Sequence, residues 1–368
     1  MARIAFLIPD LGGGGAERVA VTLIQGFVAR GHEVDVLLLR NQGQFLAMLP
    51  EAATVVDLKA ARVRNAIGPL LRYFRERRPD ALQVSMWSLT IVGIIVGRLA
   101  RRRSMRIVTS DHASLSRQYA DAPLTLLAIR LSTWLFYRWA DARICVSSGT
   151  ADDLGKLSGL GRAAFEVVYN PIPGPGGPVI VPPEVEAKWT GREGRILTVG
   201  WLKPEKNQSL LIRAFAKLVR GRRANLLLLG HGQMRAQIEE VIRHERVEAH
   251  VAFAGFDQNV WPYYMSADLF ALSSDHEGFG NVIVEAMHAG LPVVSTDCPY
   301  GPAEILDGGR FGMLVPCGDP NALADAMAAA LDRGKAADRQ RERAQEFSPD
   351  RAVDGYLRLL LGARHFRA

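Results

Sequence analysis

The sequence predicts an α/β protein made of two doubly wound, Rossmann-like domains that face each other across a cleft. Strand-like runs of apolar residues alternate with helix-length segments along the chain, which is typical of parallel sheets covered by helices. A proline-rich stretch interrupts that alternation once, after which it restarts. A chain of 368 residues is long enough for two buried cores.

The N-terminal half begins with an expected strand at residues 4–8 and a helix over 16–30, which Gly31 ends. Further strands are expected at 33–39, 81–87, 106–110, 142–146 and 166–169. In the C-terminal half we expect strands at 195–200, 225–229, 250–254, 269–272 and 293–295, and helices at 208–220, 234–245, 282–288 and 320–333.

The proline-rich stretch marks the expected domain boundary. Residues 170–183 read NPIPGPGGPVIVPP, and six prolines in fourteen residues fit neither a helix interior nor a central strand. We therefore expect an N-terminal domain over 1–172, a linker over 173–192 and a C-terminal domain over 193–347.

Composition excludes several classes of protein. Hydrophobic residues make up 48% of the chain and charged residues 23%, which excludes a disordered or collagen-like protein. The three cysteines are scattered without a C-x-x-C pair, which argues against a disulfide framework or a zinc site and favours a reducing compartment. Residues 81–97 carry no charge, but their polar side chains favour a strand and a helix over a membrane span. The chain starts directly with a strand, so we expect no signal peptide and a cytoplasmic location.

The net charge of +7 belongs to the N-terminal half. Residues 1–172 hold 22 Lys/Arg and 14 Asp/Glu, whereas residues 173–368 hold 23 and 24. Most of the excess lies in two arginine runs, at 62–78 and 98–106. Such a field attracts anionic lipid headgroups, nucleic acid or a phosphorylated substrate, and an ordinary solvated face explains it equally well.

The loops that follow strands are the candidate sites, because ligands of open α/β sheets bind at the carboxyl ends of the strands. The glycine run 12–15, with Gly14 and Gly15, follows the first strand and opens a helix. It matches neither the dinucleotide fingerprint nor a P-loop, so a binding loop and a tight turn both remain open. His112 follows the strand at 106–110 and is either satisfied locally or functional, with Asp111 as a candidate for fixing its tautomer.

Three loops of the C-terminal half are more informative. Lys203 and Lys206 lie at a strand-to-helix turn, which suits a diphosphate. Gly230 and Gly232 follow a run of leucines and leave room for a flat ligand. The third loop, at 275–281, leads into the expected helix at 282–288.

Two glutamates flank the start of that helix. Glu277 lies in the loop, and Glu285 lies about one turn inside the helix, which we expect Asn281 to cap. A carboxylate accepts two hydrogen bonds side by side, as vicinal sugar hydroxyls require. Taken alone, either glutamate is equally a solvated surface charge.

Taken together, these loops resemble the retaining glycosyltransferases of the GT-B fold, family 4, many of which extend lipopolysaccharide, capsule or other lipid-linked glycans. The resemblance covers most of the chain. It rests on residues 13–18, 170–172, 199–200 with 206–207, 230–232, the E-x7-E pattern from Glu277 to Glu285, and 298–305.

The resemblance implies that the C-terminal domain binds a nucleotide-sugar, with UDP favoured. The N-terminal domain would bind a glycan or polyprenyl-linked acceptor, and the tail 348–368 would pack back on that domain. By position, Lys206 would neutralise the diphosphate, Glu285 would hold the ribose hydroxyls and Glu277 would contact the donor sugar. His112 would lie near the reacting carbon. Further donor contacts would come from Gly14, Gly15, Lys203, Gly230, Gly232 and the backbone N–H groups of Phe279, Gly280 and Asn281.

The expected reaction retains configuration and needs no metal or other cofactor. Negative charge grows on the leaving diphosphate, where Lys206 and the helix N-terminus would stabilise it. The sequence has no D-x-D motif in a suitable loop to hold a divalent metal. Trp201 stands where the family usually has arginine, so either Lys203 supplies the second positive charge or the leaving group is stabilised less well.

The segment 124–139 is amphipathic and aromatic, with Trp134 and Trp139 beside Arg130 and Arg138. With the arginine runs it favours peripheral attachment to the inner face of the cytoplasmic membrane, and an ordinary core helix explains the aromatics about as well.

Two other functions remain open. A sugar-nucleotide epimerase or hydrolase of the same fold would need no acceptor. A non-catalytic protein that binds nucleotide-sugars or glycans would turn nothing over. A nucleic-acid partner rests on charge alone, without a recognition motif, and is not expected.

Overall fold

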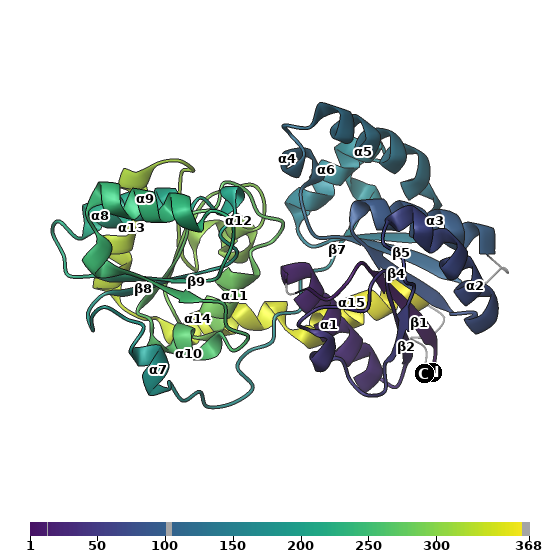
Figure 1. Ribbon diagram of the computed structural model, residues 1–368, viewed down its shortest axis with the longest axis horizontal. Helices are drawn as coiled ribbons and strands as arrows, with labels where there is room; N and C mark the ends of the chain where they lie inside the picture. Colours follow the sequence, from purple (N-terminus) through teal and green to yellow (C-terminus); the bar gives the residue numbers. More distant parts are fainter. Residues whose placement is uncertain (13, 101–104, 363–368) are drawn as a thin grey trace. The chain divides into compact units, whose positions relative to one another are not determined.

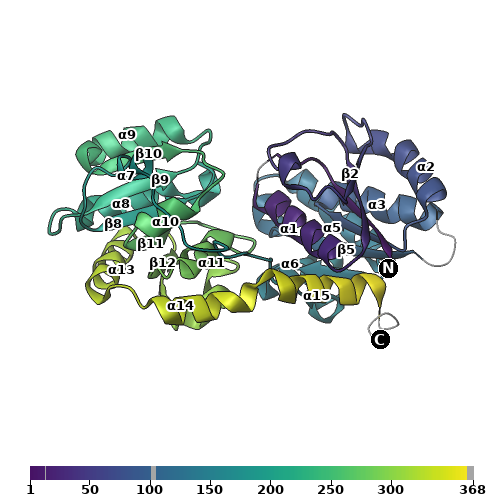
Figure 2. The ribbon, with the colours of Figure 1, turned by 90° about the horizontal axis from the view of Figure 1, so that it is seen from below.

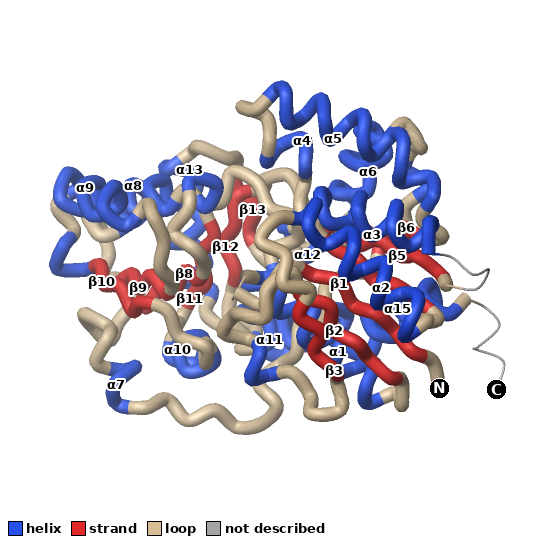
Figure 3. Tube along the Cα trace, turned by 45° about the vertical axis from the view of Figure 1, so that its right-hand side comes forward, coloured by secondary structure: helices blue, strands red, loops and turns tan. Residues whose placement is uncertain are grey.

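The computed structural model describes residues 1–12, 14–100 and 105–362, and it divides into two compact units (Figure 1). Unit 1 comprises Met1–Ile172 together with the C-terminal segment from Ser348, and unit 2 comprises Pro173–Phe347. Each unit has its own parallel sheet with helices on both faces, as the strand and helix pattern predicts (Figure 3).

In unit 1 the described residues form a seven-stranded sheet with the order β3-β2-β1-β4-β5-β6-β7. Its strands are β1 (Arg3–Ile8), β2 (Glu33–Leu38), β3 (Thr54–Asp57), β4 (Ala81–Ser85), β5 (Arg106–Asp111), β6 (Ala142–Cys145) and β7 (Glu166–Val167). Its helices are α1 (Gly15–Ala29), α2 (Ile67–Arg77), α3 (Trp87–Ala100), α4 (Leu115–Gln118), α5 (Pro123–Phe136), α6 (Ser148–Ser158) and α15 (Pro349–Leu361).

The strands of unit 1 supply two cores, because successive side chains point to opposite faces of a sheet. Ala5 and Leu7 of β1 join the core beneath α2 and α3, whereas Ile4 and Phe6 join the core beneath α1 and α15. On the first face α3 packs against both α2 and α5.

The C-terminal helix α15 belongs to unit 1, where it packs along α1 (Figure 2). A Cβ on Gly26 of α1 would lie 2.3 Å from Val353 Cγ2, so only glycine allows this approach. Arg30 donates to Asp350 Oδ1 at 2.8 Å and also pairs with Asp354. The chain therefore returns to its first domain after completing the second.

In unit 2 the described residues form a six-stranded parallel sheet with the order β10-β9-β8-β11-β12-β13. The strands are β8 (Arg195–Val199), β9 (Asn225–Leu229), β10 (Val251–Gly255), β11 (Leu269–Leu272), β12 (Val293–Thr296) and β13 (Met313–Val315). The helices are α7 (Pro183–Glu186), α8 (Gln208–Leu218), α9 (Arg235–Glu245), α10 (Trp261–Ser266), α11 (Asn281–His288), α12 (Pro302–Ile305), α13 (Pro320–Arg333) and α14 (Ala337–Ala344). The α7 helix lies inside the range 173–192 that the proline content marks as linker.

Strand order reverses once in each sheet, between β1 and β4 in unit 1 and between β8 and β11 in unit 2. Loops that leave neighbouring strands at such a reversal run in opposite directions and leave a crevice at the carboxyl edge. The loops that carry the expected site residues of unit 2 follow β8, β9 and β11.

Residues 81–97 divide between β4 and α3, as predicted. No helix in the described ranges is both long and apolar enough to cross a bilayer.

Candidate functional site

Two loops at the strand-order reversal of unit 2 bring a lysine and a glutamate together. Lys206 ends a short 3₁₀ helix, Pro204–Lys206, in the loop after β8, and Glu277 lies in the loop after the neighbouring strand β11. Lys206 Nζ donates to Glu277 Oε1 at 2.6 Å, and Ser274 Oγ donates to the same oxygen at 2.7 Å. The side chains are only 22% and 9% exposed, so the ammonium group is held at the edge of the sheet and screened from bulk water.

Further hydrogen bonds tie the two loops to each other. Asn207, in the left-handed conformation with φ of 42°, caps α8 by accepting from the Leu210 N–H at 3.2 Å. Its Nδ2 donates to Asp275 Oδ1 at 3.0 Å, across to the second loop. Ser273 Oγ donates to the Lys206 carbonyl at 3.0 Å. The position of Lys206 is therefore fixed by both loops.

The segment 298–305 supports the Glu277 loop from the other side. The Glu277 N–H donates to the Pro299 carbonyl at 2.9 Å, and the Tyr300 N–H donates to the Glu277 carbonyl at 3.0 Å. A Cβ on Gly301 would lie 1.8 Å from the Phe279 carbonyl oxygen, so this contact requires glycine. The segment thus packs directly on the loop that holds Glu277.

Glu285 lies on α11, where Tyr264 of α10 orients it. The Tyr264 hydroxyl donates to Glu285 Oε2 at 2.8 Å, and both side chains are buried. Sequence reasoning missed Tyr264, because it lies in the apolar run WPYYM, where a tyrosine reads as core. Its hydroxyl was the available signal, since a buried tyrosine O–H usually has a partner.

The expected cap of α11 is wrong. Gly280, with φ of 104°, is the N-cap residue, and Asn281 is the first residue of the helix. Only glycine takes this backbone conformation without strain, so the turn places the cap one residue earlier than the polar side chain indicates.

The glycines after β9 make room for the protein's own backbone. A Cβ on Gly230 would lie 1.9 Å from the Gly200 carbonyl oxygen, and one on Gly232 would lie 2.4 Å from the Leu202 carbonyl oxygen. The Leu202 N–H donates to the His231 carbonyl at 2.9 Å. The loops after β8 and β9 are therefore interlocked.

Trp201 contributes an aromatic surface beside these loops. Its ring centroid lies 4.2 Å from that of His231, which in turn meets Phe256 edge-on at 5.2 Å. Lys203 is exposed, and its Nζ lies 5.5 Å from the Trp201 centroid, a cation–π contact. Lys203 and Lys206 thus lie in different surroundings, one on an aromatic ring and the other in an ion pair.

In unit 1, His112 follows β5 and belongs to a chain of neutral polar groups. Its Nε2 is hydrogen-bonded to Ser110 Oγ at 3.0 Å. Gln83 Nε2 donates to Ser110 Oγ at 2.8 Å, and Ser85 Oγ lies 2.9 Å from it. These groups come from the carboxyl ends of β4 and β5.

The expected partnership of Asp111 with His112 is wrong. Asp111 Oδ1 accepts from the Tyr137 hydroxyl at 2.8 Å, on the opposite face of the sheet. Successive strand residues point to opposite faces, so Ser110 and not Asp111 shares a face with His112. Side chains two residues apart in a strand lie on the same face of the sheet, so the position of Ser110, two residues before His112, was the signal that the sequence offered for this contact.

Burial keeps both titratable groups of this region neutral near pH 6. It raises the pKa of Asp111 to about 7, against a smaller lowering by the Tyr137 hydroxyl. It lowers the pKa of His112 to about 4, against a smaller opposing contribution from Asn170. The imidazole is therefore uncharged at neutral pH.

The glycine run and the arginine runs are partly structural. Gly14 is the N-cap residue of α1, and Gly15 is its first residue. Two arginines of the runs form ion pairs: Arg77 Nε lies 3.5 Å from Oδ2 of the buried Asp35, and Arg98 Nη2 lies 3.3 Å from Asp141 Oδ2. Residues 13 and 101–104 lie outside the described residues.

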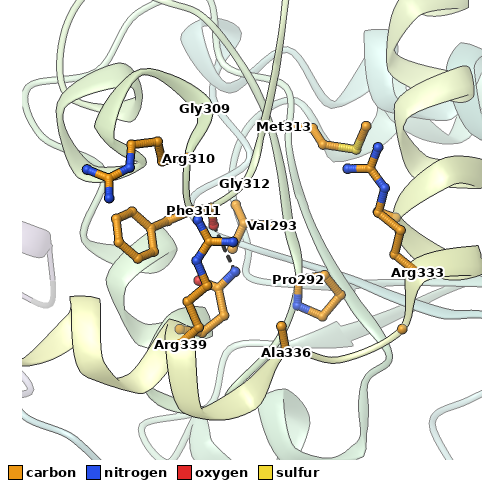
Figure 4. Close-up of a pocket in the computed structure, with 13 residues that line it drawn as sticks. Pro292, Val293, Gly309, Arg310, Phe311, Gly312, Met313, Arg333, Ala336 and Arg339 are labelled. Carbon is orange, nitrogen blue, oxygen red and sulfur yellow. Dashed lines mark hydrogen bonds between the residues drawn. The ribbon is translucent and has the colours of Figure 1, made fainter.

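A pocket lies at the opposite edge of the unit 2 sheet, where β12 and β13 begin (Figure 4). Arg310, Arg333 and Arg339 line it together with Phe311. It contains none of the site residues expected from the sequence. Among the residues that the structure describes, no group of three or more His, Cys, Asp or Glu side chains is placed to hold a metal ion.

Two family models match the chain. The model described as "Glycosyltransferase Family 4" matches residues 13–173, and the one described as "Glycosyl transferases group 1" matches residues 185–347. The chain therefore belongs to the group 1, family 4 glycosyltransferases. It is a glycosyltransferase with the GT-B fold, as the resemblance of its motifs implies.

Individual relatives agree with this family. The chain is 26% identical over 381 residues to the Campylobacter jejuni N-acetylgalactosamine-N,N'-diacetylbacillosaminyl-diphospho-undecaprenol 4-alpha-N-acetylgalactosaminyltransferase, covering 98% of this chain and all of the relative. It is 26% identical to the Erwinia amylovora amylovoran biosynthesis glycosyltransferase AmsD, covering 83% of this chain and 84% of the relative. The crystal structure of Anabaena HepE in complex with UDP-glucose has the same fold, with a TM-score of 0.80, 21% identity and coverage of 97% and 99%.

Proposed function

We propose that this glycosyltransferase moves a sugar from a nucleotide-sugar, with UDP favoured, to a glycan or lipid-linked acceptor in cell-surface polysaccharide synthesis, with retained configuration and without a metal. The observation that carries the proposal is the shielded Lys206–Glu277 pair at the strand-order reversal of unit 2. The names of the Campylobacter and Erwinia relatives support the acceptor class, and the UDP-glucose complex of HepE supports the donor.

In the proposed reaction the bond between the anomeric carbon and the diphosphate oxygen breaks, and a bond to the acceptor oxygen forms on the same face. The acceptor's proton passes to a diphosphate oxygen. Lys206 stabilises the charge that grows on the diphosphate, aided by the N-terminus of α11. Glu277 exchanges part of its contact with Lys206 for a hydroxyl of the donor sugar.

Glu285 would hold the ribose of the donor. Tyr264 occupies one carboxylate oxygen and so fixes the direction of the group. A carboxylate oriented in this way suits a pair of vicinal hydroxyls better than a freely rotating one, because less rotamer entropy is lost on binding.

His112 of unit 1 would form a hydrogen bond with the donor sugar as an uncharged group. A neutral imidazole can accept or donate a hydrogen bond, whereas an imidazolium only donates. The lowering of its pKa to about 4 keeps the acceptor capacity across the neutral range.

The proposal includes peripheral attachment to the inner face of the cytoplasmic membrane, where a polyprenyl-linked acceptor is available. The net positive charge of residues 1–172 supports this, since anionic headgroups attract it.

A thermal-shift panel of UDP-, GDP- and ADP-sugars, with and without EDTA, tests the donor class and the metal independence together. We expect UDP-sugars to raise the melting temperature most, by the same amount in EDTA. A preference for another base, or loss of the shift in EDTA, would contradict that part. Product analysis separates transfer with retained configuration from hydrolysis, which would yield free sugar without an acceptor product.

A further inference from the structure

The α5 helix turns its apolar side chains outward. Leu124, Leu127, Leu131, Trp134 and Leu135 are between 43% and 83% exposed, whereas its buried residues are Ile129 and Thr133. The exposed residues follow the spacing of three and four that places them on one side of a helix. Contiguous apolar surface of this kind marks a binding face in a folded protein.

The orientation of α5 is fixed by its polar side. Trp87 Nε1 of α3 donates to Ser132 Oγ at 2.9 Å, and the buried residues Ile129 and Thr133 lie on the inward side of α5. The helix packs against α3 and α6. Rotating α5 to bury its leucines would break the Trp87 contact, so the outward stripe is built into unit 1.

The charged residues of the α5 segment itself are of one sign. The only charged residues between 123 and 139 are Arg130 and Arg138, and both are exposed. The Arg138 guanidinium lies 4.7 Å from the centroid of the Trp134 ring, and Trp139 is 42% exposed beside it. Tryptophan and arginine beside an apolar face are the residues that sit at the headgroup level of a bilayer.

We infer that the exposed stripe of α5 lies in the interface of an anionic membrane, with its leucines among the acyl chains and Arg130 and Arg138 at the lipid phosphates. This rests on the proposed lipid-linked acceptor, for which it supplies the surface on this chain. The fourteen residues of α5 span about 21 Å, less than the roughly 30 Å of a hydrocarbon core, so the helix lies along the membrane.

The same observations disfavour a second copy of the chain on this face. A symmetric contact would bring the arginines of two stripes together without a carboxylate between 123 and 139 to neutralise them. Anionic lipid supplies that neutralising charge, which strengthens binding for each arginine near the surface.

Co-sedimentation of the full chain with vesicles tests the inference, using phosphatidylcholine alone and phosphatidylcholine with about 30% phosphatidylglycerol. We expect salt-sensitive binding to the anionic vesicles. The double variant Leu127→Glu/Leu131→Glu should bind at least about tenfold more weakly, because charge is placed on the inserted face. The matched control Ile180→Glu changes an 85% exposed apolar residue of unit 2 and should bind like the native chain.

Two further readouts keep the test decisive. Brominated lipid should quench the native tryptophan fluorescence more than that of Trp134→Phe, and equal quenching would remove Trp134 from the interface. Undiminished vesicle binding by the double variant would overturn the inference, as would a dimer that only this variant dissociates. The UDP thermal shift of the same variant reports the donor site, so loss of vesicle binding with a normal UDP shift separates this surface from the proposed function.

Discussion

The carboxyl edges of the two sheets carry polar groups of different kinds. In unit 2 the edge is charged, with Lys206 and Glu277 paired and largely shielded from water. In unit 1 the expected site residue after β5 is uncharged, with His112 linked to Ser110 and its pKa lowered to about 4. Fixed charge suits a leaving diphosphate, and neutral hydrogen-bonding groups suit sugar hydroxyls. We therefore expect unit 2 to stabilise the leaving diphosphate through charge, and unit 1 to contact the sugar through neutral hydrogen-bonding groups.

The largest expected effect comes from removing the charge of unit 2. Lys206→Ala should lower kcat by about 10³-fold, because a donor aimed at the developing charge in a screened site is worth several kcal/mol. Steady-state kinetics with a UDP-sugar measures it. Lys203→Ala changes a residue of the same loop and should lower kcat by less than about tenfold if Lys206 provides most of the stabilisation.

Stability has to be separated from activity in that experiment, since Lys206→Ala leaves the buried Glu277 without its ammonium partner. The double variant Lys206→Ala/Glu277→Gln removes the uncompensated charge and should recover melting temperature without recovering kcat. Recovered kcat would show that Lys206 acts only by holding the loops together.

In unit 1, His112→Ala should lower kcat by about 10²-fold while leaving the affinity for UDP unchanged. We expect kcat to fall without a change in UDP affinity because the neutral His112 imidazole would act on the sugar and not on the diphosphate. Calorimetry with UDP and kinetics on the same protein give both values. A weaker UDP affinity with normal kcat would place His112 in nucleotide binding instead.

The Glu285→Gln variant should weaken UDP binding by about tenfold with a smaller change in kcat, since one acceptor oxygen becomes a donor amide. Tyr264→Phe should give a smaller loss in the same direction, because the carboxylate stays but loses its orientation. Equal affinities in all three proteins would remove Glu285 from the nucleotide site.

The smallest effect concerns Asp111. Folding raises its pKa to about 7, so its contribution to stability is complete below its ordinary pKa and is lost as pH rises through about 7. The amide introduced by Asp111→Asn cannot ionise. The free energy of unfolding of this variant, minus that of the native protein, should therefore increase with pH, by on the order of 1 kcal/mol for each unit near pH 5 to 6.

Urea unfolding curves at several pH values measure this difference, and the opposite titration of His112 is common to both proteins. A difference that stays constant with pH would mean that folding does not raise the pKa of Asp111.

Much of the fold follows from sequence pattern. The long central strands and the glycine after α1 could be predicted because their apolar runs and stop signals are local. The short strands β3 and β13 could not, because three or four residues give no periodicity and their pairing depends on distant neighbours. Both α5 and α15 have an apolar side, but only the structure shows that α15 buries it and α5 exposes it.

The expected site shows the same limit. The spacing of Glu277 and Glu285 places them in one loop and the helix that follows it. Tyr264 comes from another helix, and its hydroxyl indicates only that it has a buried partner, not that this partner is Glu285. The sequence suggests Asp111 as the partner of His112 because the two are adjacent. Alternate residues of a strand share a face, however, so His112 contacts Ser110 and Asp111 contacts Tyr137. Gly280 rather than Asn281 caps α11 because backbone conformation, not side-chain polarity, determines that turn.

The most direct measurement is the affinity of UDP relative to uridine, by calorimetry on the native protein and on Lys206→Ala. The account predicts that the native protein prefers UDP, that Lys206→Ala loses at least about tenfold of this preference, and that uridine affinity is unchanged. An undiminished preference for UDP in Lys206→Ala would contradict the assignment of the diphosphate to Lys206.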